Sequence, residues 1–442
     1  MVKESSVQVS VASPVRTNAE QNTSMEQVIT PENMRRAYQR VVSNKGAPGA
    51  DGMKVTELAN DLKQHWSVLK ERLLSGDYHP RGIRSVSIPK PQGGERLLGI
   101  PVVRDRLIQQ ALLQHLTPLF ESNFSEYSFG FRPGKSAHQA VEMARSYVDA
   151  GYTWCVELDL EKFFDRVNHD ILMSCIERQV EDKRILRLIR RYLEVGVMEN
   201  GVTTLKHEGT PQGGPLSPLL SNILLNELDK ELEHRGHRFV RYADDVNIYV
   251  KSQKAGERVL ESLTIWLKRK LKLTVNKDKS HVVRPWETSY LGYSITGREK
   301  ARVKVSIQSL NRVKAKLRIL LKSARGRNIR EVIKDLNPLL RGWANYFRLN
   351  SSKTLMIDLD IWIRRKLRCA LWRQWKTPST RARKLKQLGL TEEQACRAAW
   401  NGRGPWWNAG ALHMNYALPK KIWRKVGLIS VAETIQTLNR IT

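Results

Sequence analysis

Apolar and polar residues alternate along short stretches of the chain, and this pattern predicts β-strands. Val246, Ile248 and Val250 alternate with more polar residues at a period of two, as in a half-buried strand, and a short apolar run precedes them. Residues 85–100 form two alternating runs around Pro-Gln-Gly-Gly, a turn sequence. Residues 153–160 form a more continuous apolar run that ends beside an acid. The pattern therefore predicts two β-hairpins and one buried strand.

Other stretches carry apolar residues at the spacing of an amphipathic helix. The predicted helices cover residues 31–74 around a Gly- and Pro-rich loop at 45–52, then 104–120, 219–232, 255–271, 307–323, 329–347 and 355–375. Another should begin at Thr391, because Thr391 and Gln394 fit a capping box. The order strand, helix, hairpin, helix, strand predicts an antiparallel sheet backed by helices on one face, hence an α+β fold. Beyond residue 300 we expect only helices.

Two adjacent carboxylates, Asp244 and Asp245, fall in the predicted turn of the second hairpin. Packed carboxylates repel one another unless cations neutralise them, and hard oxygen ligands of this kind suit Mg²⁺, here as a two-ion site. Asp159 ends the buried strand, a costly position for an unpaired charge, so we predict it to be a third ligand. Asp165, just beyond, is interpreted as a helix cap. The alternative for the acidic pair is a solvated surface turn.

Charge is distributed unevenly along the 442 residues. The chain has 75 Lys and Arg against 44 Asp and Glu, a net charge of +31, and residues 301–442 contribute 31 basic and 7 acidic residues, a net of +24. This region also holds eight of the twelve tryptophans. Basic residues interleaved with aromatics favour nucleic acid as the partner over a membrane surface, because no apolar run is long enough to span a bilayer. The alternative is that the basic residues solvate helix faces.

Cysteine content and the N-terminus add little chemistry. The four cysteines are far apart, which fits a reducing cytosol and provides neither a disulfide framework nor a zinc site. Residues 1–30 are predicted to be largely a polar, disordered tail.

Three loops carry candidate binding residues. Lys90 and Arg96 flank the turn of the first hairpin and could close on a triphosphate, although two exposed surface charges are the alternative. In the loop at residues 210–218, adjacent glycines between prolines allow the backbone to approach a ligand closely. Residues 402–407 are predicted to be a loop whose two tryptophans are either exposed or buried against a neighbouring helix.

An ordered series of motifs resembles the reverse transcriptases encoded by bacterial group II introns, which also act as splicing maturases. The series runs from about residue 33 to the basic C-terminus. It comprises residues 45–52, Ile88-Pro89-Lys90, residues 96–101, Tyr127-Ser128-Phe129-Gly130-Phe131-Arg132-Pro133-Gly134, Leu158-Asp159-Leu160, Thr210-Pro211-Gln212-Gly213-Gly214, Tyr242-Ala243-Asp244-Asp245, Leu291-Gly292-Tyr293 and residues 340–347.

The resemblance implies a role for each matching residue. Asp159, Asp244 and Asp245 would be the catalytic ligands of two Mg²⁺ ions, with Mn²⁺ as a possible substitute and the Leu160 carbonyl as a further ligand. Other matching residues would bind the incoming deoxynucleotide: Lys90, Arg96, Gln212, Gly213 and Lys279. Either Phe163 or Phe164 would be the steric gate that excludes a 2′ hydroxyl. Leu291, Gly292 and Tyr293 would form the primer grip.

The implied organisation is a right-hand polymerase followed by helical domains. We expect fingers and palm over residues 31–297, a thumb or maturase domain over 298–376 and a basic DNA-binding extension over 377–442. Many relatives carry a His- and Cys-containing nuclease domain. Beyond His281 only His413, Cys369 and Cys396 are available here, so the resemblance is to relatives that lack an endonuclease domain.

The implied function is RNA-directed DNA polymerisation by two-metal-ion nucleotidyl transfer, together with intron RNA binding that assists splicing and retromobility. Expected partners are an RNA template, intron RNA, a DNA primer or target and deoxynucleotides, in the bacterial cytosol and on the nucleoid, with no membrane. Two alternatives stay open: a host-adopted reverse transcriptase serving DNA repair or defence, and a non-catalytic RNA-binding maturase.

Overall fold

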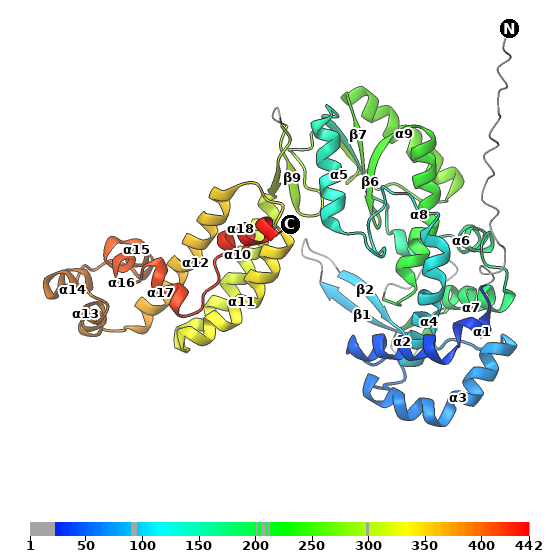
Figure 1. Cartoon of the computed structure of the whole chain (residues 1–442), viewed down its shortest axis with the longest axis horizontal. Coiled ribbons are helices and arrows are strands. Elements are labelled where there is room, and N and C mark those ends of the chain that lie inside the picture. The colour runs from blue at the N-terminus through cyan, green and yellow to red at the C-terminus, as the bar shows by residue number, and fades with distance from the viewer. Residues whose placement is uncertain are drawn as a thin grey trace, which may run out of the picture. The chain divides into compact units, whose positions relative to one another are not determined.

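The computed structural model describes residues 23–89, 95–195, 197–199, 202–204, 209, 213–297 and 300–441 (Figure 1). The chain divides into two compact units. The first runs up to Lys135 and includes Glu157–Val246 and Arg258–His281. The second comprises Ser136–Val156, Asn247–Glu257 and the chain from Val282 onward.

Helices of the first unit include those predicted over residues 31–74, 104–120 and 219–232, and others, over residues 25–28 and 163–194, that were not predicted. In chain order the helices are α1 (Met25–Val28), α2 (Pro31–Ser43), η1 (Val55–Glu57), α3 (Leu58–Ser75), α4 (Val103–Glu121), η2 (Phe163–Asp165), α6 (His169–Glu177), α7 (Lys183–Glu194) and α8 (Ser217–His234). Helix α9 (Gln253–Lys270) begins in the second unit and continues into the first. In α2, Pro31 occupies the first turn, where its missing N–H costs nothing, and Met34, Ala37 and Val41 are buried.

Two local predictions in this unit differ from the structure. The predicted tail extended to residue 30, yet Met25 and Val28 of α1 are buried, and Ser24 and Gln27 form a capping box at its start. Burial of these apolar side chains makes the segment part of the core. Asp165 does not cap a helix, because it lies inside η2, and the side chain of Asn168 accepts the Ile171 N–H at the start of α6.

Among the described residues the strands form three sheets. The first has the order β2-β1-β4-β5, from β1 (Ile83–Pro89), β2 (Glu95–Ile100), β4 (Val197–Glu199) and β5 (Val202–Thr204). The second has the order β6-β7-β3-β8, from β3 (Trp154–Leu158), β6 (Arg238–Tyr242), β7 (Asp245–Val250) and β8 (His281–Val283). The third pairs β9 (Tyr293–Ile295) with β10 (Val303–Val305).

The first sheet contains the predicted hairpin and is mixed, because a further strand joins it in parallel. Strands β1 and β2 pair antiparallel, with Ile88 opposite Arg96, but β4 joins β1 in parallel. Helices α6 and α7 precede β4, and a long helical crossover is the connection that a parallel pair requires. Pairing of this kind depends on chain segments that are far apart, so local alternation does not predict it.

Strand β10 contradicts the expectation of only helices beyond residue 300. Helices of the second unit include those predicted over residues 307–323, 329–347 and 355–375 and from Thr391, and others that were not predicted. In chain order the helices are α5 (Ala137–Asp149), α10 (Ile307–Lys322), η3 (Ser323–Gly326), α11 (Ile329–Tyr346), α12 (Lys353–Gln374), α13 (Pro378–Gln387), α14 (Glu392–Ala399), α15 (Pro405–Gly410), α16 (Leu412–Ala417), α17 (Lys420–Lys425) and α18 (Val431–Ile441). Thr391 and Gln394 form the predicted capping box at α14. Helices α13 to α16 lie together beyond the end of α12 (Figure 1).

The tryptophan pair predicted to lie in a loop belongs to a helix. Trp406 and Trp407 follow Pro405, which is the first residue of α15, so proline here starts a helix and does not prolong the loop. Trp406 is 38% exposed and Trp407 is 49% exposed, which settles the choice between exposure and burial.

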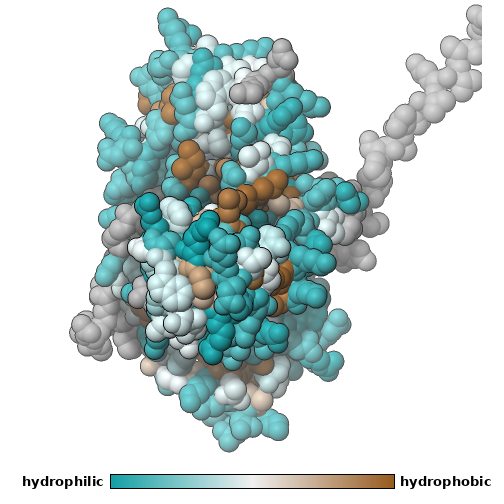
Figure 2. Space-filling view, turned by 90° about the vertical axis from the view of Figure 1, so that its left-hand side faces the viewer, coloured by the Kyte–Doolittle hydropathy of each residue, from teal (hydrophilic) through white to brown (hydrophobic). Residues whose placement is uncertain are grey.

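On the molecular face in Figure 2, hydrophilic side chains predominate and hydrophobic ones gather in a few clusters. No helix within the described ranges is both long and apolar enough to cross a membrane.

Candidate metal and nucleotide site

The structure brings the predicted carboxylates to one part of the second sheet. Asp244 lies in the turn between β6 and β7, Asp245 is the first residue of β7, and Asp159 directly follows β3. Strands β7 and β3 are neighbours in this sheet. The predicted hairpin is therefore present, and its acidic turn lies beside the end of the buried strand.

The environment of Asp245 disfavours its negative charge. Although part of Asp245 faces solvent, dense packing around its carboxyl desolvates the charge, which is the main reason that its pKa rises to about 7. The negative charges of Glu157, Asp244 and Asp159 raise the pKa of Asp245 further. The cluster thus has a surplus of negative charge, which a bound cation would relieve.

Glu157 belongs to this acidic cluster, and the sequence analysis missed it. It lies two residues before Asp159, and strand alternation places residues at this spacing on the same face, so a signal was present. His281 Nε2 lies 3.0 Å from Glu157 Oε2. A protonated His281 would partly neutralise this fourth acid.

The donor set fits a hard divalent cation. Asp159, Asp244 and Asp245 offer only carboxylate oxygens, which are the ligands that Mg²⁺ prefers. No three acidic, histidine or cysteine side chains among the described residues are already gathered around one point as a formed metal site.

Asp159 is held by the segment that precedes β8. Its N–H donates to Ser280 Oγ at 2.9 Å, and its carbonyl accepts from the Asn276 N–H at 2.9 Å. Lys279 Nζ lies 4.0 Å from Asp159 Oδ2, and its side chain is 63% exposed. Leu160, the predicted carbonyl ligand, is buried and bridges to Val275. The predicted residues Lys279 and Leu160 thus both lie next to Asp159.

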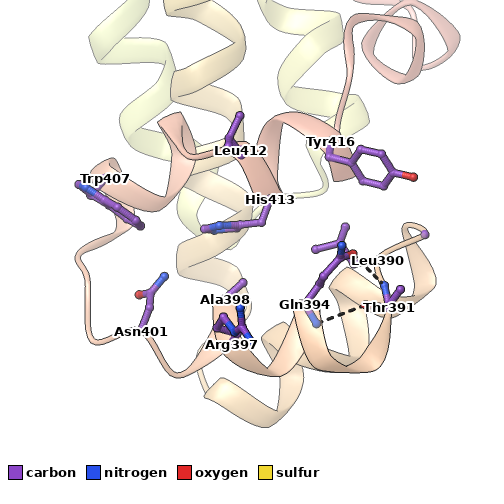
Figure 3. A pocket seen from close by; sticks show the side chains of 11 residues that line it. Leu390, Thr391, Gln394, Arg397, Ala398, Asn401, Trp407, Leu412, His413 and Tyr416 are labelled. Carbon is purple, nitrogen blue, oxygen red and sulfur yellow. Dashed lines mark hydrogen bonds between the residues drawn. The ribbon is translucent and has the colours of Figure 1, made fainter.

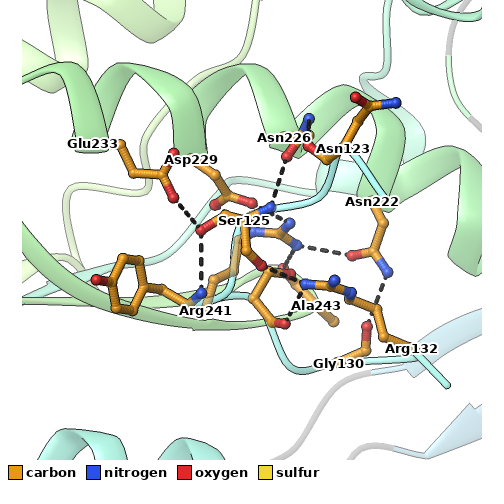
Figure 4. A network of polar contacts seen from close by, with 12 residues as sticks. Asn123, Ser125, Gly130, Arg132, Asn222, Asn226, Asp229, Glu233, Arg241 and Ala243 are labelled. Carbon is orange, nitrogen blue, oxygen red and sulfur yellow. Dashed lines mark hydrogen bonds and ion pairs between the residues drawn. The ribbon is translucent and has the colours of Figure 1, made fainter. Parts of the chain in front are cut away.

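Beneath the acidic turn lies a fully buried ion pair (Figure 4). Arg241 and Asp229 have no exposed side-chain surface, and two hydrogen bonds of 2.7 and 2.5 Å join the guanidinium to the carboxylate. Arg241 Nη1 also donates to the Ala243 carbonyl at 3.0 Å and to Asn222 Oδ1 at 2.9 Å. One arginine therefore ties the turn before Asp244 to helix α8.

The turn before Asp244 has an unusual backbone conformation and packs closely against Gly130. Ala243 has φ +58°, in the left-handed region that residues with a Cβ rarely adopt. Gly130 lies directly against the Ala243 backbone, where a Cβ would collide with it, and the Gly130 carbonyl accepts from Asn222 Nδ2 at 2.9 Å. The motif at residues 127–134 thus supports the acidic turn, a role that its sequence alone does not indicate.

Several residues predicted to bind the nucleotide fall at the edge of the described part. Lys90 and Gln212 lie outside the described residues. Arg96 is in β2, where its backbone pairs with Ile88, and its side chain is likewise outside the described part. Gly213 has φ +126°, and a Cβ there would collide with the Gly99 carbonyl of β2, so this position requires glycine.

The two phenylalanines that follow Asp159 differ in exposure. Phe163 is 2% exposed, whereas Phe164 is only partly buried. Their ring centroids are 5.2 Å apart in an edge-to-face arrangement. Phe163 therefore packs into the core of the first unit and supports Phe164, which retains surface toward solvent.

The predicted primer grip is a tight turn in the second unit. Leu291 and Gly292 have φ of +50° and +81°, and backbone hydrogen bonds close the turn between Tyr290 and Tyr293. The Tyr346 hydroxyl of α11 donates to the Leu291 carbonyl at 3.0 Å, and the rings of Tyr293 and Tyr346 stack at 6.0 Å. The motif at residues 340–347 therefore holds this turn in place.

Comparisons with known proteins match two families. Residues 88–295 match the family described as Reverse transcriptase (RNA-dependent DNA polymerase). Residues 310–389 match the family described as Group II intron, maturase-specific domain. The first range contains the acidic cluster and the turn at Leu291–Tyr293, and the second contains helices α11 and α12.

Individual relatives agree with these families. The chain is 36% identical over 295 residues to Protein YkfC of Escherichia coli K12, covering 58% of this chain and 77% of YkfC. It is 29% identical over 336 residues to Group II intron-encoded protein LtrA of Lactococcus lactis, covering 61% of this chain and 56% of LtrA. A solved partial Cas6-RT-Cas1–Cas2 complex aligns with 55% of this chain and 42% of that chain at 24% identity, with a TM-score of 0.36, too low to bear on the fold.

Proposed function

The chain belongs to the reverse transcriptases encoded by group II introns, RNA-dependent DNA polymerases that carry a maturase domain, and on that premise we propose how its residues perform the reaction. Asp159, Asp244 and Asp245 are the catalytic carboxylates and hold two Mg²⁺ ions, with Mn²⁺ as a substitute. The observation that supports this assignment is that the three carboxylates lie at the ends of the neighbouring strands β3 and β7, where the charges of Asp244 and Asp159 help to raise the pKa of Asp245.

The metal ligands also include the Leu160 backbone carbonyl in our proposal. When bound, the two ions would lower the energetic cost of negative charge on the attacking 3′ oxygen of the primer and on the leaving pyrophosphate. The hydrogen bonds that join Asp159 to Ser280 and Asn276 fix the backbone that carries Asp159. Arg241 fixes the turn that carries Asp244 and Asp245.

The remaining nucleotide-binding residues contact the incoming deoxynucleotide in our proposal. Lys90 and Arg96 grip its triphosphate, Arg96 by paired hydrogen bonds and Lys90 as a point charge. Lys279, whose exposed ammonium lies beside Asp159, adds a third positive charge. Gln212 and Gly213 line the floor of the nucleotide site, and the close approach of Gly213 to β2 supports that placement.

We assign the steric gate to Phe164, because Phe163 is committed to the core. Replacing Phe164 with valine should raise the incorporation of ribonucleotides relative to deoxynucleotides by about tenfold or more, since the ring no longer excludes a 2′ hydroxyl. The ratio of kcat/KM for a matched pair of nucleotides measures this. Phe163→Val is the control: it should lower stability and leave the ratio near the wild-type value. A larger change in the ratio for Phe163→Val would reverse the assignment.

The second unit handles the nucleic acid in our proposal. Leu291, Gly292 and Tyr293 form the primer grip, residues 298–376 form the thumb or maturase domain that binds intron RNA, and residues 377–442 form an extension that contacts the DNA target. The net charge of +24 over residues 301–442 supports polyanion binding. In the cell, this enzyme would work in the bacterial cytosol and on the nucleoid.

Primer extension tests the proposed function. With Mg²⁺, deoxynucleotides and an annealed DNA primer on an RNA template, the wild-type protein should extend the primer to the template end, and chelation of the metal should abolish extension. A folded protein that binds intron RNA but does not extend the primer would instead be a non-catalytic maturase.

The genomic setting distinguishes the intron-encoded role from a host-adopted role. The intron-encoded role requires flanking DNA that folds into the intron's catalytic RNA, and the protein should increase the splicing rate of that RNA in vitro. Active polymerase without such flanking DNA would favour a function in DNA repair or defence.

A further inference from the structure

A pocket of about 650 Å³ lies within the second unit, among the helices beyond α12 (Figure 3). Trp407 of α15 and Leu412, His413 and Tyr416 of α16 lie opposite Ala398 and Gln394 of α14. The volume falls within the range of pockets that bind small organic ligands. None of the residues proposed for catalysis lines this pocket.

Aromatic rings form the lining and remain accessible. Trp407 is 49% exposed and Tyr416 is 68% exposed, although large aromatic side chains are usually well covered in a folded domain. The His413 ring lies 6.4 Å from the Trp407 ring and 5.6 Å from that of Trp372, between the two. The pocket therefore presents flat π-surfaces next to open space.

Polar groups line the pocket beside these rings. The His413 ring is part of the lining, but its Nε2 atom is buried and does not reach the open space. Asn401 also lines the pocket, and its amide is already hydrogen-bonded to Asn408 and to the Arg403 N–H. Gln394 adds a further side-chain amide, whose Oε1 accepts from the Thr391 N–H. A flat ligand with a hydrogen-bonding edge would match the rings and the Gln394 amide.

The positive charge around the pocket indicates that the ligand is part of a polyanion. Residues 378–417 hold six basic and two acidic residues. Both acids are already paired, Glu392 with Lys386 and Glu393 with Arg397, each at 2.6 Å. Arg403 is exposed and lies over the Trp407 ring at 5.4 Å, so a positive charge borders the aromatic surface. A phosphate backbone would be attracted to the rim while its base enters the pocket.

We propose that this pocket binds an unpaired nucleobase of single-stranded DNA, stacked on Trp407, with the polar edge of the base facing Gln394. The proposal rests on the proposed function in that the ligand is nucleic acid. It adds that the C-terminal extension holds a base directly and does not merely attract the backbone.

The test compares two strands of equal charge. Wild-type protein, preloaded with an RNA template annealed to a DNA primer so that the polymerase site is filled, is titrated with oligothymidylate and with an abasic strand of the same length. Wild type should prefer the strand with bases. Trp407→Ala should weaken binding of oligothymidylate by about tenfold and leave binding of the abasic strand unchanged, because only the stacking contact is lost.

A control variant and a second measurement test whether the effect of Trp407→Ala is specific to the pocket. Trp400 is 58% exposed and does not line the pocket, so Trp400→Ala should bind both strands as wild type does. Trp407→Ala should still extend a primer at the wild-type rate, which separates failure of this proposal from failure of the proposed function. Equal weakening toward both strands by Trp407→Ala, or no preference of wild type for bases, would overturn the nucleobase pocket.

Discussion

Substituting Asp244 with asparagine is expected to reduce primer extension on an RNA template by about a thousandfold, without unfolding the protein. Asparagine has nearly the same size and suits a turn, so the hairpin between β6 and β7 should keep its backbone. It carries no negative charge, however, and the site would lose one of the three carboxylates that draw the metal ions. Asp159→Asn should reduce primer extension to a similar degree, because it also removes one of the three negative charges that would draw the metal ions.

The measurement is the initial rate of extension with saturating deoxynucleotides, alongside the thermal midpoint of unfolding. Asp170→Asn provides a matched control, because Asp170 is 78% exposed on α6 and forms a surface ion pair with Arg190 of α7. That control should extend at the wild-type rate. If Asp244→Asn kept most of the wild-type rate while remaining dependent on Mg²⁺, the assignment of the acidic turn to the metal site would be wrong.

Replacing Asp229 with alanine is expected to lower the free energy of unfolding of the first unit by about 3–5 kcal/mol. The change leaves the Arg241 guanidinium charged, fully buried and without its carboxylate partner. An uncompensated buried charge is far more costly than a lost exposed pair. Urea titration followed by circular dichroism measures the loss, with Asp170→Ala as the comparison, since its exposed pair with Arg190 contributes about 1 kcal/mol or less.

A double variant separates the stabilising role of this pair from its role at the turn. Asp229→Leu combined with Arg241→Met should recover much of the lost stability, because two apolar side chains of similar size replace both charges. It should not recover primer extension, since the hydrogen bond from Arg241 to the Ala243 carbonyl would still be missing. Full recovery of activity in the stable double variant would show that the acidic turn holds its shape without Arg241.

Local patterns in the sequence predicted many of the longer helices, both hairpins, the buried strand β3 and the position of the acids. The hairpin around Asp244 followed from alternation, and the start of α14 followed from the capping pair Thr391 and Gln394. These signals are local, because a turn, a cap or an amphipathic face involves residues within a few positions of one another. The family motifs added the roles of individual residues, which geometry alone did not assign.

The features that the sequence did not predict depend on residues that are distant in sequence, or on local signals that fit two interpretations. Nothing near Arg241 indicates that it is buried against Asp229, because the pair forms only when α8 packs on β6. Pro405 was interpreted as part of a loop, although proline is equally common in the first turn of a helix. Asp165 was chosen as a cap where Asn168 performs that function, since both residue types suit the position.

The support beneath the acidic turn joins parts of the chain that are far apart. Gly130, Asn222 and Arg241 come from three segments, and the hydrogen bond between Asn222 and Gly130 alone spans 92 positions of the chain. Contacts from these segments hold Ala243 in its left-handed backbone. We therefore expect a substitution in any one of the three segments to disturb the same turn, although the three positions are remote from one another in the sequence.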